Sequence, residues 1–495
     1  MSFRMSQPLV QELESLPDVA ETLRRFADWP DCVLFDSASQ RPELGRYSFL
    51  TADPFEIEER TSVTFGVDPF ERLRGWSQRF QAVTVPGLPP FQGGVAGLLS
   101  YELGSAWERL QSPGFDEFEL PWLAVGVYDW AIAWDHLQER AWVTSHGFPA
   151  EGADRSRRAA ERMSEVLERL RVSDFSKTVH QKKRASGAAS APRSDAKSTG
   201  GLTLPRSPIQ QAALPGLVGL TSNFSKEEYL RAVERVIEYI RAGDIFQANL
   251  SQRLLFPADE DGLALYLRLR ERNAAPFAGY FAHDDWVVAS ASPERFVSLR
   301  DGEVETRPIK GTRRRRHLPE ADLYTEDELR ESEKDQAENV MIVDLLRNDL
   351  SKVCAPGSIR VPKLCAVETY ETVQHLVSVI RGSMDHDQSG RRLDAWDLLQ
   401  ATFPGGSITG APKVRAMQII AELEPTVRGP YCGSLFYVGF DGTADSNLLI
   451  RTFTVRRGWI QFPVGGGIVA QSDPLAEYEE TLHKAEGMLR ALRER

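Results

Sequence analysis

The chain has 495 residues and a formal charge of −12, from 59 Lys and Arg against 71 Asp and Glu, and 42% of its residues are hydrophobic. This apolar share is ordinary for a globular protein, which excludes disorder along the whole chain. The negative balance argues against a general nucleic-acid binder, because phosphates require a basic surface. A small anionic substrate stays compatible, since a local basic pocket can lie in an acidic protein.

The N-terminal residues, MSFRMSQPLVQELESLP, place acidic side chains where a signal peptide would have its apolar core. No stretch of the sequence is apolar for long enough to span a bilayer. The cysteines Cys32, Cys354, Cys365 and Cys432 form no C-x-x-C pair, which argues against a zinc ribbon or a disulfide framework. We therefore expect a cytoplasmic protein that contacts no membrane and no nucleic acid.

Short apolar runs broken by Gly, Pro and Asp fill residues 33–142, among them CVLFDS, FQGGVAGLLSYELG and WLAVGVYDWAIAWD. Such runs are typical of strands, and a charged helical stretch follows at residues 150–172. We assign residues 1–172 to an N-terminal region. Residues 173–215 are rich in Ala, Ser, Gly, Pro and Lys, and they predict a flexible linker because their few apolar groups cannot offset the entropy of ordering.

The remaining region, residues 216–495, starts with a well-marked helix. In NFSKEEYLRAVERVIEYIRAGD, Ser225 and Glu228 form a capping box and Gly243 supplies the stop. Strand-like runs such as WVVASAS and GSLFYVGF then mix with helices without regular alternation. This pattern favours an α+β fold over a doubly wound sheet.

A lysine in the basic run RPIKGTRRRR stands out. Lys310 lies between Pro308 and Ile309 on one side and Gly311 on the other. A lysine in such an apolar setting can have its pKa lowered and act as a nucleophile. Taken alone the signal is weak, and the lone His375 is more typical of a packed core residue than of a catalyst.

Two predicted helices carry carboxylates that could converge. Asp335 and Glu338 are three residues apart in SEKDQAENVMIVDL and share one helix face. The second helix starts at Ser472 or Asp473, with Pro474 in its first turn, and places Glu477, Glu480 and Lys484 on one face. Facing helices of this kind would suit Mg²⁺, which prefers oxygen ligands. The alternative is that these acids are solvent-facing charges.

Two glycine-rich segments could bring backbone close to a ligand. The segment FPGGSITGAPKVRAM puts a Gly-rich turn before a helix that starts near Pro412 and Lys413, which suits a carboxylate. It is no Walker A loop, because no Ser or Thr follows the lysine. The run Gly465 to Gly467 is either a second such approach or a plain tight turn.

Together these segments resemble the chorismate-utilising enzymes, which include the anthranilate, aminodeoxychorismate, isochorismate and salicylate synthases. The resemblance extends from about residue 33 to the C-terminus and rests on IFQANLSQR, SPERF, RPIKGT, ENVMIVDLLRND, HLVS, YCGSLFYVGF, NLLIRT and GGGIVAQSDPLAEYEET besides FPGGSITGAPKVRAM. It implies the fold of anthranilate synthase component I, in which two packed antiparallel β-sheets form a sandwich with helices on the outside. For the lysine, the carboxylate helices and the glycine-rich segments described above, the resemblance also favours a role in binding or catalysis over a purely structural one.

Two positions discriminate between branches of this family. Isochorismate-type enzymes have a lysine base where this chain has Gln247, so the glutamine resembles the ammonia-using branches. Anthranilate synthases typically read P-I-A-G-T where this chain has Lys310, and that lysine resembles the mark of the aminodeoxychorismate branch. The resemblance therefore implies amination of chorismate to 4-amino-4-deoxychorismate for p-aminobenzoate and folate. An anthranilate synthase component I or a catalytically silent chorismate-binding subunit are the alternatives.

The resemblance also implies residue roles. Glu294 of SPERF would be the general acid and Lys310 the nucleophile that forms a covalent adduct, with His375 near the reacting ring. Mg²⁺ would be held by Glu338 and Glu480 directly and by Asp335 and Glu477 through water. Further substrate contacts would come from Gln247, Gly311, Thr312, Ser407, Tyr431, Arg451, Gly465, Gly466, Gly467 and Lys484.

Two further expectations concern partners. None of the four cysteines lies in the Gly-rich elbow of a glutaminase nucleophile, so we expect a separate glutamine amidotransferase subunit to supply ammonia. The N-terminal region resembles the family's effector-binding part. Its pocket would contain Ser37, Pro276 and Phe277, with Asp36 where anthranilate synthases have a glutamate, so inhibition by an effector such as tryptophan is left open.

Overall fold

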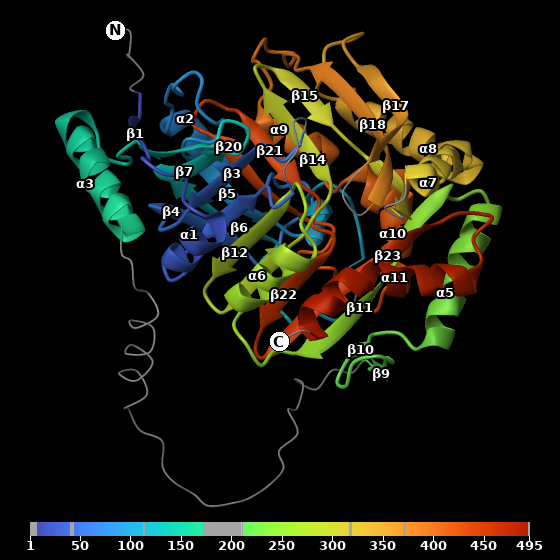
Figure 1. The fold of residues 1–495 in the computed structure, drawn as a ribbon. Coiled ribbons are helices and arrows are strands. Elements are labelled where there is room, and N and C mark those ends of the chain that lie inside the picture. The colour runs from blue at the N-terminus through green and yellow to red at the C-terminus, as the bar shows by residue number, and fades with distance from the viewer. Residues whose placement is uncertain are drawn as a thin grey trace, which may run out of the picture.

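The computed structural model describes residues 7–39, 44–111, 114–171, 209, 211–315, 319–369 and 373–493. It confirms the predicted α+β class, because two antiparallel sheets of 13 and 10 strands pack together with helices around them (Figure 1). In this part of the chain no helix combines the length and apolar character needed to cross a membrane.

The larger sheet joins strands from the whole length of the chain. Its strand order is β1 (Leu9–Glu12), β8 (Arg140–Ser145), β7 (Trp130–Asp135), β3 (Tyr47–Thr51), β2 (Val33–Asp36), β12 (Ala278–His283), β13 (Trp286–Ser290), β22 (Thr452–Arg456), β23 (Trp459–Ile468), β11 (Gln247–Pro257), β10 (Thr221–Ser222) and β9 (Ala212–Ala213), with β19 (Gly410–Ala411) also paired to β11. Strands from residues 1–172 meet strands from residues 216–495 where Phe35 pairs with Gly279.

The smaller sheet, also antiparallel, likewise joins strands from both parts of the chain. Its order is β16 (Ile309–Arg314), β18 (Val373–Ser383), β15 (Glu303–Thr306), β14 (Arg295–Arg300), β21 (Ala444–Asn447), β20 (Ser434–Gly439), β5 (Gly94–Leu99), β6 (Leu123–Tyr128) and β4 (Glu56–Arg60), with β17 (Arg360–Thr369) paired to β18. The predicted flexible linker at 173–215 lies outside the described residues, except for 209 and 211–215, where the short strand β9 forms.

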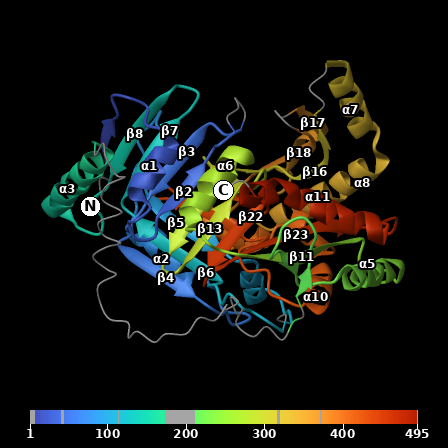
Figure 2. The ribbon, with the colours of Figure 1, turned by 60° about the horizontal axis from the view of Figure 1, so that its bottom comes forward.

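Ten α-helices are described, and they cover the outer faces of the sheets. They are α1 (Val19–Phe26), α2 (Glu71–Arg79), α3 (Gly152–Arg171), α5 (Lys226–Arg241), α6 (Gly262–Arg272), α7 (Pro319–Glu331), α8 (Glu333–Leu350), α9 (Ala395–Thr402), α10 (Lys413–Leu423) and α11 (Pro474–Arg493). Both views place α3 at one end of the molecule and α5, α7 and α8 at the other (Figure 1 and Figure 2). The capping box of Ser225 and Glu228 starts α5 as predicted.

Four apolar clusters hold these elements together, three of them as layers against the sheets and a fourth among α5, α10, α11 and β11. The layer between the sheets packs Phe49 and Phe281 of the larger sheet against Leu98 and Tyr437 of the smaller one. A second layer lies between the larger sheet and helices α1, α3, α6 and α11, and a third lies between the smaller sheet and α2, α8 and α9. Burial of apolar surface on this scale is the main term that stabilises the fold.

Candidate active site

Lys310 lies on β16, at an irregularity in the pairing of this strand with β18. Its ammonium donates a hydrogen bond to the Ser407 carbonyl oxygen at 3.1 Å. Desolvation lowers the pKa of Lys310, and the nearby carboxylates of Glu338 and Glu294 oppose this shift only in part. A larger share of neutral amine is therefore present than for a lysine in water.

Glu294 precedes β14 and is almost fully buried, at 5% exposure. Burial raises the pKa of Glu294 to about 7, although a hydrogen bond from the Ser407 hydroxyl, at 2.8 Å from Oε1, acts to lower it. Ser407 belongs to the short 3₁₀ helix η2 (Gly406–Ile408) and so contacts both Lys310 and Glu294. The sequence-predicted acid and nucleophile are thus joined through one residue.

Gly311 follows Lys310 and has a φ of +77°, which favours glycine. A Cβ atom at this position would lie 3.0 Å from Cγ of Asp335 on α8. The glycine therefore lets β16 approach the start of α8, where the Ser332 cap hydroxyl accepts a hydrogen bond from the Asp335 amide. Thr312 pairs with His375 of β18, which brings that buried histidine into the register next to Lys310.

The four predicted carboxylates come from α8 and α11, and each has a cationic or hydroxyl partner. Arg313 donates to Asp335 at 2.9 Å, Ser472 donates to Glu477 at 2.6 Å, and Lys484 pairs with Glu480 at 2.7 Å. Lys334 lies between the helices, with Nζ 3.9 Å from Glu338 Oε1 and 3.6 Å from Glu477 Oε1. These ion pairs show that α8 and α11 face each other across this space.

The charges of this group act on each other. Burial raises the pKa of Glu338, with the positive charge of Lys310 opposing it. Burial also acts to raise the pKa of Glu480, but Lys484 outweighs it and the pKa is lowered. Burial acts to lower the pKa of Lys334, and the carboxylates of Glu477 and Glu338 outweigh this and raise it. The space between the helices therefore favours a cation.

These donors fit Mg²⁺ in kind, because all are carboxylate oxygens on two facing helices. They do not form a compact ligand set, since within the described ranges the only group of three or more ligand atoms within 4.8 Å of one another is Glu59, His283 and Asp284. Lys334, which the sequence analysis missed, takes the position of the cation between Glu338 and Glu477. Its place four residues before Glu338 is the signal that could have identified it.

Arg451 stands without an ion pair or side-chain hydrogen bond to the described residues, and desolvation lowers the pKa of its guanidinium. Its φ of +53° is unusual for a residue with a side chain. Lys484 donates to the Gly465 carbonyl oxygen at 2.9 Å. A Cβ on Gly466 would lie 3.2 Å from Glu477 Oε2, so β23 is glycine where it meets the acids.

Gln247 at the start of β11 is fully buried, and neither its amide oxygen nor its amide nitrogen has a hydrogen-bond partner among the described residues. A Cβ on Gly467 would collide with this amide. A buried amide with no partner destabilises the folded state by about 1–3 kcal/mol. The position of the Gln247 amide next to the glycines of β23 therefore points to a ligand that would satisfy it.

Other predicted residues have protein partners. Tyr431 is buried, with the Arg428 guanidinium 5.8 Å from its ring centroid. Lys413, at the start of α10, forms an ion pair with Asp349 at 2.5 Å and donates to the Thr402 carbonyl oxygen. The lysine of the Gly-rich turn is therefore engaged inside the fold. The second carboxylate helix starts as predicted, because Asp473 accepts from the Ala476 amide.

Ser37, Pro276 and Phe277 line one cavity of about 590 Å³ between the sheets. The Ser37 hydroxyl donates to the Tyr47 carbonyl oxygen at 2.6 Å. Asp36, in the position of the effector-motif acid, accepts hydrogen bonds from Tyr266 at 2.8 Å and from Arg270 at 2.6 Å. This acid is therefore already engaged by the protein.

Proteins of known family are similar to this chain in sequence and in fold. The model of the chorismate binding enzyme family matches residues 31–490. An aminodeoxychorismate synthase component 1 from Klebsiella aerogenes is 40% identical over 508 residues, covering 99% of this chain and 100% of that protein. An anthranilate synthase component 1 from Streptomyces coelicolor is 38% identical over 492 residues, covering 98% and 89%. The crystal structure of anthranilate synthase component I from Streptococcus pneumoniae superposes with a TM-score of 0.73 at 28% identity, covering 91% and 93%.

Proposed function

Since the chain belongs to the chorismate binding enzyme family, we propose that it aminates chorismate at C4 and forms 4-amino-4-deoxychorismate. The observation that carries this proposal is Lys310 beside Glu294, with both held by Ser407. This lysine stands where the anthranilate-forming branch typically has alanine. The similarity to aminodeoxychorismate synthase component 1 over the full length supports the same branch.

The reaction proceeds in two steps in this proposal. The neutral amine of Lys310 attacks C2 of chorismate, the ring double bond shifts, and the C4 oxygen leaves as water with the proton of Glu294. Ammonia then attacks C4, the C2–N bond breaks, and Lys310 leaves as the neutral amine. The new ammonium group returns a proton to the Glu294 carboxylate, so both groups are regenerated.

The raised pKa of Glu294, about 7, suits this role, because its acid form is present near neutral pH. The lowered pKa of Lys310 suits a nucleophile that must be neutral. Both shifts have the same main cause, which is burial. His375 lies across from Thr312 in the same ladder, and we assign it to the wall next to the ring without a proton-transfer role.

Binding of a dicarboxylate would use the cations and backbone groups around β23. The unpaired Arg451 guanidinium can bind a carboxylate through two parallel hydrogen bonds, and Lys484 adds a second positive charge. When bound, Mg²⁺ would neutralise a substrate carboxylate, with Glu338 and Glu480 as direct ligands and Asp335 and Glu477 behind water. The remaining contacts would come from Gly311, Thr312, Ser407, Tyr431 and the backbone of Gly465 to Gly467.

Ammonia would come from a glutamine amidotransferase subunit. The name component 1 carried by the full-length relatives supports a second component. The unpaired amide of Gln247 would meet the substrate or the incoming ammonia, because both of its hydrogen-bonding atoms are unmet by the described residues. The cavity at Ser37, Pro276 and Phe277 would be the effector-type pocket.

A second candidate is anthranilate synthase component I, which the 38% identity to the Streptomyces coelicolor enzyme supports. A silent chorismate-binding subunit is less well supported, because binding needs no acid with the raised pKa of Glu294. The test is incubation of the purified protein with chorismate, Mg²⁺ and an ammonium salt, followed by chromatography. We expect 4-amino-4-deoxychorismate and no pyruvate. Fluorescent anthranilate with pyruvate would contradict the proposal, and recovery of unchanged chorismate would support the silent subunit.

A further inference from the structure

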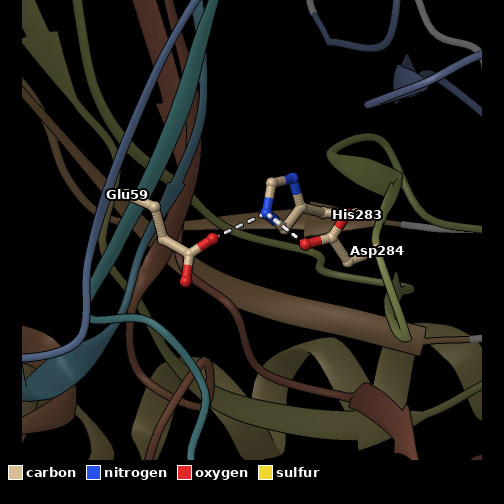
Figure 3. Close-up of side chains that lie close together, drawn as sticks. All are labelled: Glu59, His283 and Asp284. Atoms are coloured by element: carbon tan, nitrogen blue, oxygen red, sulfur yellow. Dashed lines mark hydrogen bonds and ion pairs between the residues drawn. The ribbon is translucent and has the colours of Figure 1, made fainter.

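A group of ligand-type side chains lies away from Lys310, at the junction of the two sheets. His283 is the last residue of β12, Asp284 occupies the turn that follows, and Glu59 is on β4 of the other sheet (Figure 3). Asp31 comes just before β2. Three of these segments are distant in sequence, since His283 is 224 residues from Glu59 and 252 from Asp31.

The imidazole of His283 is fixed in one orientation. Its Nδ1 contacts a carboxylate oxygen of Asp31, and its Nε2 lies 2.8 Å from Glu59 Oε2 and 3.7 Å from Asp284 Oδ2. The side chain is only 7% exposed, and the rings of Trp286 and Phe281 lie with centroids 5.3 and 6.1 Å from its own. The ring therefore cannot turn away from the two carboxylates that face Nε2.

This is the arrangement of a metal-binding histidine. Such a residue usually holds one ring nitrogen against a carboxylate, which orients the other nitrogen toward the ion. Here Asp31 takes Nδ1, and the ligand atoms of Glu59, His283 and Asp284 all lie within 4.8 Å of one another. A buried histidine whose Nε2 faces carboxylates from two different segments, and hydrogen-bonds one of them, is more specific than a cluster of surface acids alone.

The group is open to solvent, and one neighbouring acid is not available to it as a ligand. The Glu59 and Asp284 side chains are 40% and 83% exposed, so an ion can reach them from solvent. The neighbouring acid Asp285 is directed elsewhere, because Arg456 donates to it at 2.9 Å. It therefore offers a matched control residue one position from the proposed ligand Asp284.

We propose that Glu59, His283 and Asp284 bind one Zn²⁺ ion, and that Asp31 positions the His283 ring. One imidazole nitrogen and carboxylate oxygens are ligands that Zn²⁺ accepts, with water completing the coordination. The ion would link β4 of the smaller sheet to the β12–β13 hairpin of the larger one. It would therefore act as a structural clamp between sequence-distant segments, with no part in the chemistry at Lys310.

The test uses the full-length protein after treatment with a chelator. Calorimetric titration with Zn²⁺ should give one equivalent in the wild type, and Glu59→Gln or Asp284→Asn should each weaken Kd by about 10- to 100-fold. Asp285→Asn should bind as the wild type does. Co²⁺ in place of Zn²⁺ gives a visible spectrum that reports its ligands, and this spectrum should be lost in the two ligand variants.

Measurements of Tm and of amination distinguish zinc binding at this group from zinc binding elsewhere on the protein. Saturating Zn²⁺ should raise the Tm of the wild type and Asp285→Asn but not of Glu59→Gln, while amination of chorismate with Mg²⁺ stays unchanged in all three. Equal Zn²⁺ affinity and equal rise in Tm for the wild type and both ligand variants would place the ion elsewhere and overturn the proposal. Absence of any wild-type binding would overturn it as well.

Discussion

The site around Lys310 and the cavity around Ser37 differ in how their buried polar groups are satisfied. Arginines that line the cavity pair with acids, as Arg46 does with Asp135 outside the lining at 2.7 Å and Arg295 with Asp445 at 2.9 Å. At the site, Gln247 and Arg451 have no side-chain partner among the described residues. The paired charges of the cavity stabilise the fold, whereas Gln247 and Arg451 at the site are available to a ligand.

This difference has a physical cost. Each buried group without a partner destabilises the folded state by about 1–3 kcal/mol, while a paired group contributes about 1 kcal/mol. A protein keeps such groups where a ligand satisfies them, and stability is then lower than an apolar replacement would give. The comparison predicts that substitutions at the site change rate more than stability, and that those in the cavity do the opposite.

The largest effect should come from Lys310→Ala. Loss of the nucleophile should lower kcat for amination of chorismate by about 10²- to 10⁴-fold, while the Tm changes less, because burial makes the lysine charge costly and already favours the protonated forms of Glu294 and Glu338. Lys363→Ala, on the same sheet but outside the site, is the control and should keep full rate. An unchanged kcat in Lys310→Ala would show that the lysine is no nucleophile.

In the cavity, Asp36→Asn should act on stability. The carboxylate that accepts from Tyr266 and Arg270 is lost, so the free energy of unfolding should fall by about 1–3 kcal/mol in urea denaturation. The exposed Asp301 lines the same cavity, and Asp301→Asn should change stability by less than about 0.5 kcal/mol. A loss of amination in Asp36→Asn at full stability would show that Asp36 serves the reaction rather than the fold.

Ser407→Ala tests the pKa of the acid. The hydroxyl stabilises the Glu294 carboxylate and lowers its pKa, so its removal should raise that pKa. The acid form is the active one, so the rate falls as pH rises through about 7 in the wild type. In Ser407→Ala this alkaline limb should move up by about one pH unit, the equivalent of about 1.4 kcal/mol. If the alkaline limb of the pH–rate profile stays in place or moves to lower pH, a group other than Glu294 controls it.

The smallest effect on stability is expected for Gln247→Leu. It removes an amide with no partner, so the free energy of unfolding should stay the same or rise by up to about 1 kcal/mol, while turnover falls. Gln252 on the same strand is the matched control, because it is also fully buried but hydrogen-bonded to Ser222 and Thr481. Gln252→Leu should lose about 1–3 kcal/mol. An equal loss of unfolding free energy in Gln247→Leu and Gln252→Leu would show that Gln247 is as well satisfied in the fold as Gln252.

Local signals predicted the elements well. The capping box at Ser225 and Glu228 and the cap at Asp473 identified where α5 and α11 start, because a cap is set by residues three positions apart. The α+β class followed from strand-like runs without alternation. These signals depend on neighbours in the chain, so the sequence carries them directly.

Contacts between distant segments could not be predicted in this way. The pairing of Phe35 with Gly279, the position of Lys334 between two helices and the unmet amide of Gln247 depend on which segments the fold brings together. Lys413 is a further example. The sequence around it indicated an anion site, but in the fold its ammonium forms an ion pair with Asp349. The family resemblance named the candidate site residues in advance, and the structure adds the contacts of Ser407 with Lys310 and Glu294.

In the proposed reaction, Lys310 becomes covalently attached to the substrate ring. The most direct test of this attachment is peptide mass spectrometry of the wild-type protein mixed with chorismate and Mg²⁺ without ammonia and then acid-quenched. We expect the peptide containing Lys310 to gain the mass of one chorismate less one water, and we expect ammonium salt to remove this addition. Formation of 4-amino-4-deoxychorismate with Lys310 unmodified under every quench condition would contradict it.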